Sequence, residues 1–75
     1  MNQLPILSAR EVLAALKRLG FEIVRQKGSH IKLKKKIGDR MSITIVPNHK
    51  NIMRGTLKGV LELAEVKPED FINNL

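Results

Sequence analysis

The chain has 75 residues, and its 14 Lys and Arg against seven Asp and Glu give a formal net charge of +7. A chain of this length builds one small domain with a shallow site rather than a deep enclosed pocket, and its basic balance favours a polyanionic partner. The absence of cysteine excludes a disulfide framework and a cysteine-ligated zinc site, and two histidines with few carboxylates near them predict neither a metal site nor another cofactor.

Targeting and membrane segments are also not predicted. No apolar run approaches the ~20 residues of a membrane span, and residues 1–8 lack the charged and long apolar regions of a signal peptide. We therefore expect a cytoplasmic protein with no membrane partner. We expect a single domain over residues 1–75, with a core over about 8–67 and a short tail helix over 68–75.

The first predicted element is a helix over about residues 9–19. Ser8 and Glu11 occupy the N-cap and N3 positions of a capping box. Gly20 suits the left-handed conformation that commonly follows the last turn of a helix. Apolar residues recur at helical spacing between these two ends: Val12, Leu13, Leu16 and Leu19.

Three short strands with tight connections follow. The strands are predicted over residues 21–26, 30–34 and 41–46, separated by a turn at 27–29 and a hairpin connection at 36–40. Because both connections are short, the three strands form an antiparallel meander. In the second strand apolar and polar residues alternate, so Ile31 and Leu33 face one way while His30, Lys32 and Lys34 face the other.

Two helices complete the chain after a loop at residues 47–51. The first begins near Gly55, with Thr56 as its N-cap, and its apolar stripe comprises Leu57, Val60, Leu61 and either Leu63 or Ala64. The second is short and begins at Pro68, followed by acidic residues that suit the helix dipole. Phe71, Ile72 and Leu75 are the residues expected to anchor it.

The element order predicts an α+β fold, α-β-β-β-α with a short C-terminal helix. Each main helix carries one apolar stripe, so both are expected to pack on one face of a three-stranded antiparallel sheet. The other face, with His30, Lys32 and Lys34, is then left open. This is the architecture of a fold similar to the double-stranded-RNA-binding domain.

The candidate site is the Gly28-Ser29-His30 turn and the basic strand behind it. His30 titrates near neutrality and precedes a run of lysines, so a proton acceptor lies in a positive field that attracts phosphate. RNA carries its own nucleophile, the 2′-hydroxyl. The protein therefore needs a general base and positive charge near the phosphate, but no metal.

The other candidate residues are assigned to RNA binding or to the turn. Lys27, Lys32 and Lys34 are expected to contact phosphate, and Ser29 to hydrogen-bond either His30 or a phosphate. Gly28 is a structural turn residue. His49 and Lys50, in the loop before the second main helix, are either RNA backbone contacts or ordinary loop residues.

Two function classes remain open from the residues. One is a metal-independent endoribonuclease; the other is a noncatalytic RNA-binding module that uses the same basic face. Only the first needs a titrating group at residue 30. With two Phe and no Tyr or Trp, recognition is expected to be led by the RNA backbone rather than by base stacking.

Four segments carry a family resemblance that covers roughly residues 8–67. They are Leu19-Gly20-Phe21, Arg25-Gln26-Lys27-Gly28-Ser29-His30, Pro47-Asn48-His49 and Arg54-Gly55-Thr56-Leu57, with Leu61 and Ala64 beyond them. Together they resemble the HicA toxin family, mRNA interferases of type II toxin–antitoxin systems.

The resemblance implies a fold similar to the double-stranded-RNA-binding domain and ribosome-independent cleavage of mRNA. It implies that His30 is the catalytic residue and that a HicB-type antitoxin covers the site. The sequence departs from the family pattern in its very basic loop at 36–40 and in its extension over 67–75. Neither departure touches the motif around His30.

Overall fold

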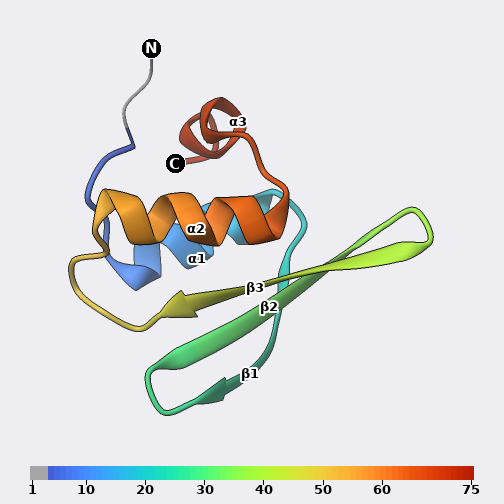
Figure 1. Ribbon diagram of the computed structural model, residues 1–75, viewed down its shortest axis with the longest axis horizontal. Coiled ribbons are helices and arrows are strands. Elements are labelled where there is room, and N and C mark those ends of the chain that lie inside the picture. The colour runs from blue at the N-terminus through green and yellow to red at the C-terminus, as the bar shows by residue number, and fades with distance from the viewer. Residues whose placement is uncertain (1–3) are drawn as a thin grey trace.

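The computed structural model describes residues 4–75 as an open three-stranded sheet with helices on one side (Figure 1). The elements are α1 (Ala9–Arg18), β1 (Glu22–Lys27), β2 (His30–Ile37), β3 (Arg40–Pro47), α2 (Arg54–Ala64) and α3 (Pro68–Ile72). Neighbouring strands are antiparallel in the order β1-β2-β3. The predicted α-β-β-β-α fold with a short C-terminal helix is confirmed.

Two statements concern the ends of the chain. Residues 1–3, part of the segment assessed for a signal peptide, lie outside the described residues. Between residues 4 and 75, none of the helices has both the length and the apolar character that crossing a membrane requires.

The capping box predicted for α1 is present. The Ser8 hydroxyl accepts a hydrogen bond from the Glu11 backbone N–H at 3.2 Å, and the Glu11 carboxylate accepts one from the Ser8 backbone N–H at 3.0 Å. The bond from the Ser8 backbone, with a smaller contribution from its hydroxyl, lowers the pKa of Glu11. The helix ends one residue earlier than predicted, at Arg18, and Gly20 follows with a φ of 100°.

The second and third strands are longer than predicted because the turn between them has only two residues, Gly38 and Asp39. β2 therefore runs to Ile37 rather than to residue 34. On its core side, Lys35 lies over the ring of Phe21, with its Nζ 5.9 Å from the ring centroid. Phe21 itself is buried and precedes β1, which begins at Glu22.

The sheet packs on the helices through a mixed apolar and hydroxyl face. Ile31 and Leu33 of β2 are buried, as the predicted alternation requires. From β3, the Thr44 hydroxyl donates to the Val60 carbonyl of α2 at 2.7 Å. The core is completed by apolar residues from the helices and connecting segments: Leu4, Leu7, Ala9, Val12, Ala15, Leu16, Phe21, Val46, Ile52, Leu57, Val60, Leu61, Ala64 and Phe71.

The predicted start of α2 is wrong. Thr56 is not the N-cap; Met53 is, and it makes no side-chain capping bond. Contacts distant in sequence hold the start of the helix instead, because Arg54 Nε donates to the Leu4 carbonyl at 2.7 Å and Ile52 N–H donates to the Leu7 carbonyl at 2.7 Å. No local sequence signal encodes such contacts.

The C-terminal part of the chain resolves two open points. Ala64 is buried and belongs to the apolar stripe of α2, whereas Leu63 is exposed. In the tail, Phe71 is fully buried and Ile72 is packed against the core. Leu75 is half exposed, so the prediction that it anchors α3 is wrong.

We predict that Phe71→Ala lowers the free energy of unfolding by about 3–5 kcal/mol, because it removes a fully buried aromatic side chain from the core. Leu75→Ala is the matched control, since Leu75 lies four residues further along the same tail and is exposed; its effect is expected to stay within about 0.5 kcal/mol. Urea unfolding followed by circular dichroism measures both. Equal midpoints for the two variants would show that α3 contributes nothing to the core.

Candidate active site

His30 is positioned by a two-residue turn between β1 and β2. Lys27 and His30 form the last pair of the ladder, so Gly28 and Ser29 make the whole connection. Gly28 has a φ of 58°, and such a two-residue hairpin turn requires glycine at its first position. A Cβ atom at Gly28 would meet nothing within 4 Å, so the backbone conformation alone accounts for glycine there.

Main-chain hydrogen bonds hold this turn against the rest of the molecule. The Ser29 carbonyl accepts a bond from the Asn48 N–H at 2.7 Å, and the His49 carbonyl accepts one from the Ala9 N–H at 2.9 Å. The loop after β3 thus connects the turn before His30 to the beginning of α1. His30 also pairs with Pro47 of β3, so it lies between both neighbouring strands.

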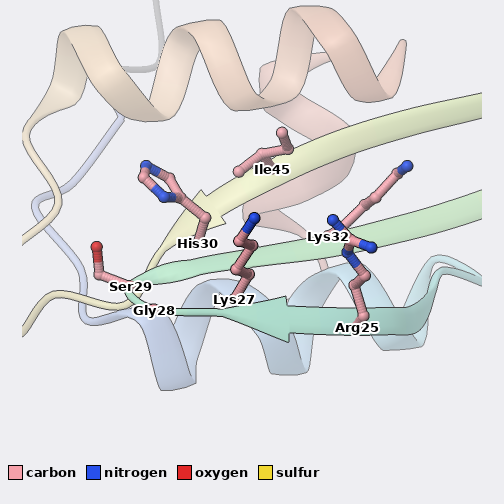
Figure 2. A pocket seen from close by; sticks show the side chains of 7 residues that line it. All are labelled: Arg25, Lys27, Gly28, Ser29, His30, Lys32 and Ile45. Carbon is pink, nitrogen blue, oxygen red and sulfur yellow. The ribbon is translucent and has the colours of Figure 1, made fainter.

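A hollow of about 540 Å³ opens beside this turn on the uncovered face of the sheet (Figure 2). We call it the His30 cavity. Its lining combines one imidazole, one hydroxyl, three cationic side chains and one aliphatic side chain, with glycine in the turn. The lining residues are Arg25, Lys27, Gly28, Ser29, His30, Lys32 and Ile45.

Strand register explains why these side chains meet. Lys27 is opposite His30, Arg25 is opposite Lys32, and Lys32 is opposite Ile45. Opposed residues in an antiparallel sheet share a face. Four of the seven candidate site residues on this strand pair and turn, namely Lys27, Ser29, His30 and Lys32, line the cavity together with the turn residue Gly28.

Three predicted RNA-binding residues lie outside the cavity lining. Lys34 is further along β2, where its Nζ is 3.7 Å from Glu22 Oε1. His49 and Lys50 are exposed in the loop after β3. That loop reaches the cavity indirectly, through the bond between Asn48 and the Ser29 carbonyl.

Arg25 and Ile45 line the cavity but were not among the predicted site residues. Both were recoverable by counting. Arg25 is two residues before Lys27 and therefore shares its face. Counting back from the Gly38-Asp39 turn brings Ile45 opposite Lys32. The missing step was the length of that turn, because a five-residue connection gives no definite register.

The charge around the cavity is positive. Its lining has three cations and no carboxylate. Phosphate groups are stabilised in such a setting, and an imidazole beside them has the geometry of a proton acceptor. Within residues 4–75 there is no group of three or more His, Cys, Asp or Glu side chains placed to hold a metal ion.

Fold and cavity together define a small basic α+β protein whose open sheet face gathers a histidine and several cations in one shallow site. A family model described as "HicA toxin of bacterial toxin-antitoxin" matches residues 9–66. The chain belongs to the HicA toxin family, and it is thus a toxin of a toxin–antitoxin system. No curated protein matches the sequence closely enough to extend this comparison.

We predict that Gly28→Ala and Gly38→Ala lower the free energy of unfolding by similar amounts, about 1–3 kcal/mol each, because both force an L residue into a sparsely populated conformation. The two glycines are matched: their φ values are 58° and 60°, and neither has an atom within 4 Å of an added Cβ. Denaturant unfolding measures both. A much larger loss at Gly28 would mean that packing, and not backbone conformation, restricts the turn beside His30.

Proposed function

We propose that this protein is a ribosome-independent endoribonuclease that cleaves mRNA without a metal, with His30 as its general base. The observation that supports the proposal is the placement of His30 with Arg25, Lys27 and Lys32 around one open cavity. Membership of a toxin family adds the biological setting, in which mRNA in the cytoplasm is the substrate.

The chemistry needs few groups from the protein. His30 takes the proton from a ribose 2′-hydroxyl, whose oxygen attacks the adjacent phosphorus. The new O2′–P bond forms as the P–O5′ bond breaks, leaving a 2′,3′-cyclic phosphate and a 5′-hydroxyl. Arg25, Lys27 and Lys32 offset the negative charge that increases on the phosphate oxygens. The leaving oxygen takes its proton from protonated His30, a lysine or water.

The shallow site suits a flexible single strand. The cavity lies on an uncovered face, and a single strand can present a ribose and its phosphate there without strand separation (Figure 2). Lysine and arginine contacts to phosphate carry little sequence information. We therefore assign RNA backbone contacts to Lys27, Ser29, Lys32, Lys34, His49 and Lys50, with Arg25 added to them.

Control by a HicB-type antitoxin completes the proposal. A ribonuclease made beside cellular mRNA needs an inhibitor, and a family of toxin–antitoxin systems supplies one. Charge complementarity with a protein of net charge +7 favours an antitoxin that is acidic on its contacting side. Such a partner inhibits cleavage by covering His30 and its neighbouring lysines.

The second candidate is a noncatalytic RNA-binding module that uses the same face. One observation favours it: the cavity has no carboxylate to orient the imidazole, as is usual for a histidine that acts as a base. The two candidates differ at a single residue, because only catalysis requires a titrating group at position 30.

We predict that His30→Ala lowers the rate of RNA cleavage by about 10²–10⁴-fold, the usual effect of losing a general base. The fold is expected to persist because His30 is exposed. His49→Ala, equally exposed but outside the cavity lining, is the matched control. The assay uses labelled single-stranded RNA with excess EDTA, and it scores both the rate and the cyclic phosphate end.

Circular dichroism of both variants controls for folding. Equal cleavage by wild type and His30→Ala would leave the binding module as the better account. Loss of cleavage in EDTA, with recovery on adding a divalent metal, would refute the metal-independent mechanism.

We predict that Lys27→Ala with Lys32→Ala reduces the slope of log K against log salt for single-stranded RNA by about 1.4, because two phosphate contacts are lost. Lys17→Ala with Lys58→Ala removes the same charge from exposed positions on α1 and α2 and is the matched control. Its slope is expected to change little. If both double variants lower the slope equally, then net charge rather than the cavity directs RNA binding.

A further inference from the structure

β3 has an inverted pattern of polarity. Its core-facing side includes the buried hydroxyl residues Ser42 and Thr44, which donate to the carbonyls of Leu63 and Val60 in α2 at 3.1 and 2.7 Å. Its outward side carries three large apolar residues at alternate positions. These residues, the β3 stripe, are Met41, Ile43 and Ile45, which are 47%, 43% and 43% exposed.

The two edges of the sheet are built differently. β1 has a register shift between Ile23 and Arg25, and charged or amide residues cover most of its length, two devices that discourage further strand pairing. β3 has neither. It pairs with β2 without interruption from Arg40 to Pro47, and among the described residues its segment 40–46 makes no backbone hydrogen bond beyond the sheet.

A row of lysines runs beside the β3 stripe. Lys32, Lys34 and Lys36 of β2 are opposite Ile45, Ile43 and Met41, so the apolar and cationic rows share the open face. The β2–β3 hairpin extends past the ends of α1 and α2, which leaves part of this edge clear of the helical layer (Figure 1). The open face thus combines an unpaired strand edge, aliphatic side chains and positive charge.

We propose that β3 is a docking edge for an acidic protein partner, which adds an extended segment to the sheet, packs apolar side chains on the β3 stripe and directs carboxylates toward the lysine row. Main-chain pairing at an exposed edge is a known mode of recognition. The inference rests on the proposed function only in identifying this partner as the antitoxin.

Charge decides among the possible occupants. A second copy of this chain would bring together two proteins of net charge +7, which opposes self-association. RNA would satisfy the lysines but would gain little from a row of aliphatic side chains on an unpaired strand edge. An acidic extended segment matches all three features.

The position of Ile45 links docking to inhibition. Ile45 belongs to the β3 stripe and also lines the His30 cavity. A segment paired with the full length of β3 therefore reaches the rim of the cavity, where it obstructs RNA.

The test measures binding of the product of the neighbouring gene to wild type, Ile43→Lys and Val24→Lys by calorimetry. The two substitutions are matched: each adds one charge at an apolar strand residue, and Ile43 and Val24 are 43% and 44% exposed. Ile43→Lys is expected to weaken binding at least about tenfold, and Val24→Lys less than about threefold. Neither residue lines the His30 cavity, so RNA cleavage is expected at the wild-type rate.

Hydrogen exchange on the wild-type complex gives a second readout. Amides in residues 41–46 are expected to become protected in the complex, while those in 22–27 are not. Unchanged affinity of Ile43→Lys, unchanged exchange at 41–46, or failure of the neighbouring product to bind would each overturn the inference. So would a dimer of the toxin alone that Ile43→Lys abolishes, because a second copy would then be the occupant. Failure of wild type to cleave RNA would refute the proposed catalysis alone.

Discussion

The hydrogen bond from the buried Thr44 hydroxyl to the Val60 carbonyl determines which face of β3 is turned toward the helices. A slip of one residue in the register of β3 would turn Ser42 and Thr44 outward and bring Met41, Ile43 and Ile45 into the core. Apolar burial alone would favour that alternative. Two satisfied hydroxyls, the buried Val46 and the two-residue turn at Gly38-Asp39 together hold the observed register, and this register places Ile45 beside His30.

The site depends on the backbone more than on side chains. His30 follows a two-residue turn, and the turn is held by the bond between the Ser29 carbonyl and the Asn48 N–H. A second main-chain bond, from Ala9 to His49, continues the connection to α1. Because main-chain groups make these bonds, the side chains of the loop after β3 remain available for contacts with RNA or with a partner.

Local signals in the sequence were sufficient for most of the fold. The Ser8–Glu11 capping box, the alternation in β2 and the proline before α3 each act within a few residues, and each led to the correct element. The start of α2 was misplaced because it depends on Leu4 and Leu7, which lie more than 40 positions earlier. The inverted faces of β3 were not predicted, since in a run of alternating hydroxyl and aliphatic residues only the carbonyls of α2 show which set is buried.

The β3 stripe also affects how the free toxin behaves in a crowded solution. A regular unpaired strand with exposed aliphatic side chains is a template for intermolecular β-sheet growth. The neighbouring lysines act as gatekeepers, because each molecule that approaches edge to edge meets a matching row of like charge. The cations that attract RNA therefore also keep the protein in solution, and removing them to disarm the toxin would at the same time expose it to aggregation.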